Sequence, residues 1–232
     1  MQSDPMQSDL ATEHLQVIRI LMERSILYRR ALAPMMLLTG ALGTAAALVG
    51  GWAQIGAEEA GAHRFVVYWL AVAVATLSAA LVLVRRQALR ASEPFWSLPT
   101  QRVVRAGLPA AGSGLVLGLM VYGVLVLDPQ DAGPWRAAAL RELPMAWAVL
   151  YGCALHAAGF FMPRGIKWFG WILILGGWAL FAGVHLPAVE WVGLREVSRC
   201  LWAHGVMGLF FGVLHLVYGV YLTCTEPKAL AA

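Results

Sequence analysis

Six apolar stretches of close to twenty residues constrain the fold of this chain more than any other feature of its sequence. An α-helix rises about 1.5 Å per residue, so about 20 residues cross the roughly 30 Å of hydrocarbon in a bilayer. The stretches are too long for strands, lack alternation of apolar and polar residues, and hold no Asp, Glu, Lys or Arg at their centres. The sequence therefore predicts an all-α, polytopic membrane helix bundle of about six transmembrane helices, at residues 34–52, 65–84, 108–127, 145–162, 168–186 and 201–224.

The composition and the flanking segments define a single membrane domain. Hydrophobic residues make up 60% of the chain and charged residues 13%, whereas soluble domains are about half apolar and about a quarter charged. We predict a six-helix transmembrane domain at 33–226 and a short tail at 227–232. Within the leader, 1–32, residues 9–30 have the spacing of an amphipathic helix that would lie along the membrane surface or form an ordinary solvated helix.

The distribution of Lys and Arg predicts the orientation in the membrane. Twelve of the 17 basic residues fall in the leader, the second and fourth loops and the tail, and five fall in the other loops. Cytoplasmic loops carry the excess of Lys and Arg, so both termini are expected in the cytoplasm, with the protein in the cell inner (plasma) membrane. The lipid bilayer is then its main partner. Because the net charge of +4 resides in short loops, no nucleic acid is expected.

Four histidines within or beside the predicted spans are the candidate functional residues, because an ionisable group inside a membrane is costly. His156 and His215 are expected at one level in the cytoplasmic half, and His185 and His204 at one level near the outer surface. One hypothesis is bis-histidine ligation of haem b, with His156 and His215 holding the iron and the other pair a second haem. The residues expected to complete these sites are Gly208, Gly212 and Gly219, on one face of the last span, and Arg164, for a propionate.

The same histidines and glycines have an alternative interpretation as parts of the fold. Glycines spaced four residues apart let membrane helices approach closely, as the pair Gly208 and Gly212 would. A histidine inside a bundle can also be satisfied by a carbonyl or a hydroxyl group. The hydroxyl partners considered for this role are Tyr122, Tyr151, Tyr218 and Thr223.

Two segments of the C-terminal half carry a resemblance to known sequences. YGCALHAAGFFMPRGIKWFGW (151–171) and AHGVMGLFFGVLHLVYGVYL (203–222) resemble stretches of uncharacterised bacterial inner-membrane proteins of six predicted helices. The resemblance implies no activity, cofactor or site residue.

Three classes of function follow from these patterns. The first is a non-catalytic membrane subunit or accessory protein that binds a partner, and the alternatives are a haem-binding electron-transfer protein and a small channel or carrier for a neutral solute. No P-loop, HExxH or GxSxG pattern occurs, so an enzyme is not favoured. A homo-oligomer or a larger membrane complex is expected, because the glycine face of the last span would otherwise contact lipid.

Overall fold

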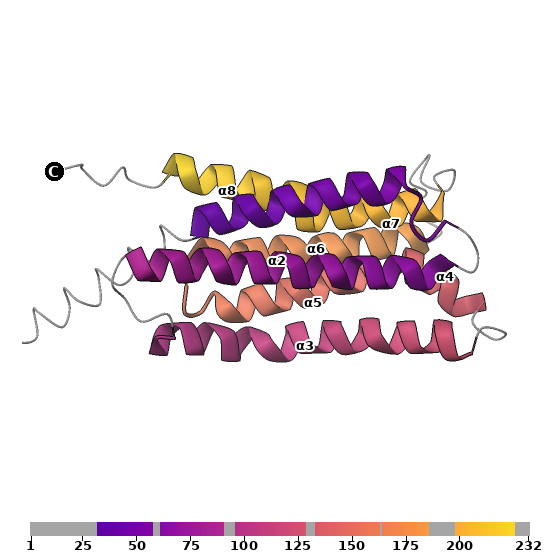
Figure 1. The fold of residues 1–232 in the computed structure, drawn as a ribbon, viewed down its shortest axis with the longest axis horizontal. Coiled ribbons are helices and arrows are strands. Elements are labelled where there is room, and N and C mark those ends of the chain that lie inside the picture. The colour runs from indigo at the N-terminus through magenta and orange to yellow at the C-terminus, as the bar shows by residue number, and fades with distance from the viewer. Residues whose placement is uncertain are drawn as a thin grey trace, which may run out of the picture.

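The structure is a computed structural model in which every regular element of the described residues is a helix. It describes residues 32–57, 61–90, 96–128, 133–162, 164–185 and 198–225. The predicted amphipathic helix at 9–30 and the tail at 227–232 lie outside these ranges. The predicted all-α bundle is confirmed, and its helices run alongside one another with nearly parallel axes (Figure 1).

Among the described residues, five helices are long and apolar enough to cross a membrane, which makes the chain an integral membrane protein of the multi-pass type. The first of them has no label in Figure 1, where it is drawn in indigo, and the last is a continuous helix with three parts, α7, η2 and α8. The helices are the first helix (Leu32–Trp52), α2 (Ala62–Arg90), α3 (Leu98–Leu127), α4 (Gly133–Arg141), α5 (Leu143–Ala158), α6 (Arg164–His185), α7 (Arg199–Met207), η2 (Gly208–Val213) and α8 (Leu214–Thr225).

The fourth predicted span differs most from its prediction. The sequence predicts a span at 145–162, but α5 ends at Ala158 and has 16 residues, so it rises only about 24 Å. Gly159 caps the helix, and the amides of Phe160 and Phe161 donate to the carbonyls of Ala157 and Ala158 in turns that follow it. α5 is therefore a short apolar helix, and it passes through the bundle between α3 and α6 (Figure 1).

The second loop also differs, because helix continues where apolar character has ended. α2 runs on through Arg85 and Arg86 to Arg90, and α3 begins at Leu98, ten residues before the predicted span. Ser97 caps α3 by accepting a hydrogen bond from the Thr100 amide at 3.5 Å. The apolar pattern locates the part of a helix that lies in lipid, whereas Arg, Gln and Ala extend it into the headgroup region.

The core joins the last span to the rest of the bundle. One cluster of buried side chains links α2, α3, α4, α5 and α7, and a second links the first helix, α5, α6, α7 and η2. The first helix and the last span touch through glycines: a Cβ atom added at Gly40 would lie 2.9 Å from the carbonyl oxygen of Gly212. Such close approach requires residues without side chains and is typical of membrane helix pairs.

Candidate functional site

The last span is interrupted by a π-helix at Gly208–Val213, between His204 and His215, two of the four candidate histidines. In this segment the amide of Leu214 donates to the carbonyl of Leu209, five residues earlier, instead of four. A π-helix widens the turn by one residue, is rare, and often occurs at functional positions in helices. The segment was not predicted, because its apolar residues also suit an ordinary α-helix.

His204 is 1% exposed and has both ring nitrogens in hydrogen bonds. The indole of Trp69 donates to Nδ1 at 3.2 Å, and since an indole nitrogen only donates, Nδ1 carries no proton. Nε2 therefore carries the proton and donates to the carbonyl oxygen of Ile55 at 3.0 Å. Phe65 meets the ring edge-on at a centroid distance of 5.2 Å. His204 thus ties α7 to α2 and to the turn after the first helix.

His215 is 0% exposed and has the opposite tautomer. Nδ1 donates to the carbonyl of Phe210 at 2.9 Å, because a carbonyl only accepts. Nε2 then accepts from the hydroxyl of Tyr151 on α5, at 3.2 Å. The ring of Phe169 on α6 meets the imidazole edge-on at 4.9 Å. One side chain therefore satisfies a carbonyl inside the π-helix and connects it to α5 and α6.

The other two histidines have local partners. His156 Nδ1 lies 3.5 Å from the carbonyl of Lys167, and its ring meets Trp171 edge-on. His185 Nε2 lies 3.5 Å from a carboxylate oxygen of Glu142, which joins the end of α6 to the turn before α5. Within the described ranges, no hydrogen bond or ring contact joins either predicted pair, His156 with His215 or His185 with His204.

The glycine face of the last span is covered by the first helix. A Cβ atom added at Gly208 would lie 2.6 Å from Cβ of Ala47. One at Gly212 would lie 2.7 Å from the amide nitrogen of Thr44, and one at Gly219 would lie 2.9 Å from that of Leu37. A helix therefore occupies the surface on which the haem hypothesis places a macrocycle.

The haem hypothesis consequently gains no support from this geometry, although it stays a prediction. The fold occupies both nitrogens of His204 and both of His215, so iron ligation at either would break an existing hydrogen bond. Arg164 begins α6, and its side chain lies outside what the structure describes. Among the described residues, no three His, Cys, Asp or Glu side chains are grouped as metal ligands.

Sequence reasoning found the histidines but missed most of what they bind. Tyr151 was among the hydroxyl partners considered, and it does bind His215. A carbonyl partner agrees with the alternative interpretation in general. The sequence does not indicate Trp69, or which carbonyls are bound, because the contacts of Trp69 and Ile55 join distant segments and that of Phe210 depends on the π-helix. No protein-family model, curated protein or solved structure matches the chain.

Proposed function

We propose that this integral membrane protein is a non-catalytic subunit that binds a partner membrane protein through the outward face of α6. The observation that carries the proposal is a stripe of exposed aromatic and aliphatic side chains along that helix. At 100° per residue these positions fall on one side of α6, opposite the buried Ile166, Phe169 and Leu173. The stripe consists of Trp168, Trp171, Ile172, Leu175 and Trp178.

The depth of two of the indoles separates this stripe from an ordinary aromatic belt. Trp178 is 56% exposed and lies seven residues before His185, about 10 Å along the helix from its end. Trp171 lies at a similar distance from the other end. Belt tryptophans sit at the membrane interface, where water and headgroups accept from the indole N–H.

Lipid tails offer no hydrogen-bond acceptor, so an indole N–H deep in the membrane is satisfied only if it faces a protein group. Neither the Trp171 nor the Trp178 indole donates a hydrogen bond to another described residue, whereas the Trp147 indole donates to the carbonyl of Gly114 at 2.8 Å. A partner helix with a hydroxyl, amide or free carbonyl on its surface would accept from both. Aromatic residues are also enriched at protein interfaces.

The interior groups support a role at the surface. His204 and His215 are engaged in holding segments together, as the hydrogen bonds described above show, and the glycines hold the first helix against the last span. The exposed stripe on α6 takes no part in these contacts of His204, His215 and the glycines.

Photo-crosslinking in native membranes tests the proposal. A photoreactive amino acid at Leu175, which is 60% exposed within the stripe, should give one discrete protein adduct. The matched control is the same amino acid at Leu119, which is 51% exposed on α3. Replacing both indoles by W171L and W178L should abolish the adduct at 175. Adducts at both sites, or only lipid at both, would overturn the proposal.

A further inference from the structure

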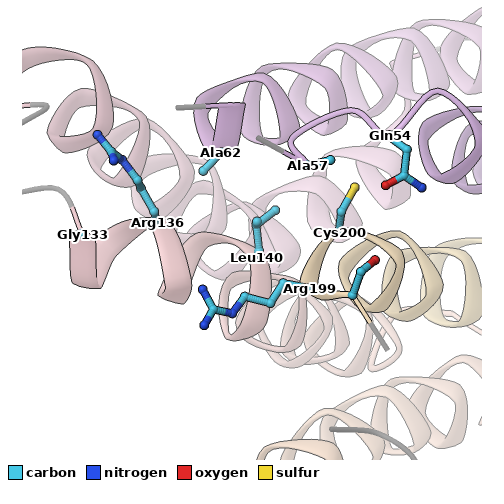
Figure 2. A pocket seen from close by; sticks show the side chains of 9 residues that line it. Gln54, Ala57, Ala62, Gly133, Arg136, Leu140, Arg199 and Cys200 are labelled. Carbon is cyan, nitrogen blue, oxygen red and sulfur yellow. The ribbon is translucent and has the colours of Figure 1, made fainter. Parts of the chain in front are cut away.

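A cavity of about 460 Å³ opens at the end of the bundle where the first helix ends and the last span begins. Four stretches of chain meet there: the turn after the first helix, and the beginnings of α2, α4 and α7 (Figure 2). Cavities of a few hundred cubic ångströms hold small ligands in other proteins. The lining residues are Gln54, Ala57, Ala62, Gly133, Arg136, Leu140, Ser198, Arg199 and Cys200.

Three helices point their N-termini at this cavity. Ala62, Gly133 and Arg199 are the first residues of α2, α4 and α7, and all three line it. A helix N-terminus carries about half a positive charge, and its first amides have no partner within the helix. None of the three helices has an acidic residue in its first turn to offset this charge. The three N-termini therefore favour a negative charge at this end of the bundle, where the Ser198 hydroxyl already accepts from the Leu201 amide of α7.

Two arginines line the cavity and bring a full positive charge each. Arg136 extends from α4 and Arg199 from the start of α7, and their guanidinium groups lie apart in Figure 2. Each guanidinium has five N–H donors, so an arginine that already has one partner can still bind an anion. None of the described lining residues is acidic.

The remaining lining is suited to a ligand with one polar end. Ala57, Ala62 and Leu140 give apolar contact, while Gln54 and Ser198 are polar. The cavity lies at the ends of the spans, so in a bilayer it would lie near the headgroup phosphates. Arginine and helix N-termini are the groups that proteins use most to hold phosphate.

We infer that this cavity binds a phosphate-type anion through Arg136, Arg199 and the N-termini of α2, α4 and α7. Two sources would present this chemistry at the membrane surface: the headgroup of an anionic phospholipid, and inorganic phosphate in solution. Either would draw the two guanidinium groups together and join α4 to α7, neighbouring helices in the bundle.

Lipid titration of the purified full chain in neutral detergent tests the inference. Phosphatidylglycerol and inorganic phosphate are added separately, and the affinity is measured from the rise of the melting temperature and from native mass spectra. R136A and R199A should each weaken binding about tenfold or more, because each substitution removes charge-assisted hydrogen bonds to the anion. R199K should bind at an intermediate level, because lysine keeps the charge but not the planar fork.

R141A is the matched control. Arg141 lies on α4 at the same end of the bundle, outside the cavity, where it donates to the carbonyl of Val184. The R141A variant should bind phosphatidylglycerol and phosphate as tightly as the unchanged chain does. Stabilisation by the lipid alone would identify a headgroup site, and equal stabilisation by phosphate a solute site. Equal loss in R141A, or no binding of either probe, would overturn the inference. The inference would also be overturned if R136A and R199A had lower melting temperatures without either probe but bound both probes normally. The outcome is independent of cross-linking at α6.

Discussion

His215 joins three parts of the bundle through one imidazole ring, so its removal should cost more than one hydrogen bond. In Y151F the ring loses a donor to Nε2, and the free energy of unfolding should fall by about 1 kcal/mol. In H215A the Tyr151 hydroxyl and the Phe210 carbonyl both lose their partner and a cavity is left, so we expect a loss of about 2–4 kcal/mol.

Thermal unfolding of both variants and of the double variant in detergent measures this difference. The two losses should not add, because both substitutions remove the same hydrogen bond. The visible spectrum is the control for the haem hypothesis. A Soret band in the unchanged protein that disappears in H215A would favour iron ligation over the role described above.

Gly50 and Gly51 are adjacent residues near the end of the first helix that should respond oppositely to alanine. A Cβ atom at position 50 would overlap the ring of His204, which is held on both sides and cannot move without breaking its hydrogen bonds to Trp69 and Ile55. At position 51 the nearest atom is a side-chain carbon of Leu201 at 3.6 Å, an ordinary contact.

G50A should therefore lower the melting temperature by several degrees, whereas G51A should leave it unchanged or raise it slightly, as Ala favours helix over Gly. Both melts are measured in one detergent. Equal melting temperatures for G50A and G51A would contradict the close contact between Gly50 and the ring of His204.

At the scale of elements, the π-helix packs so closely against the first helix that no side chain fits between them at Gly212. A Cβ atom at Gly212 would lie 2.7 Å from the amide nitrogen and 3.0 Å from Cα of Thr44, which are backbone atoms that cannot give way cheaply. G212A should thus push the helices apart and destabilise the protein by about 1–3 kcal/mol. Gly205 has nothing within 4 Å of the same added atom, so G205A is the matched control in the same span. Equal unfolding free energies for the two variants would contradict this packing.

The elements also show how far the sequence could predict the fold. Apolar length located the helices, because burial of a span in lipid needs only composition and length. The end of α5 and the beginning of α3 were missed, since they depend on a Gly cap and on polar residues that still favour helix. Three further features depend on contacts between distant segments, which a single sequence does not display. They are the π-helix, the hydrogen bond from Trp69 to His204, and the packing of the glycines of the last span against the first helix.

At the scale of the whole molecule, the helices pass back and forth so that the bundle begins and ends at the same side. Figure 1 shows the start of the first helix and the end of α8 at one end, opposite the end of the first helix and the beginning of α7. The short α5 counts as a pass, because it leads from α4 at one end toward α6, which begins at the other. The first described residue, Leu32, and the last, Thr225, therefore lie at the same end of the bundle, whereas the location of the two termini stays a prediction.

Which side this is depends on charge, and cysteine labelling can decide it. The end that holds Arg85, Arg86, Arg90 and Lys167 carries most of the basic residues, so it should face the cytoplasm. Cys224 is exposed at that end, while Cys200 is buried at the other. A membrane-impermeant maleimide should therefore modify the chain in inverted vesicles and not in intact cells, and C224S should remove the signal.

In the C224S background, A57C places a thiol in the exposed turn at the opposite end and should be labelled in intact cells. Labelling of Cys224 from outside, with A57C protected, would mean that the basic loops face outward. The cavity of Figure 2 would then lie in the cytoplasmic leaflet, where anionic lipids and soluble phosphate both reach it.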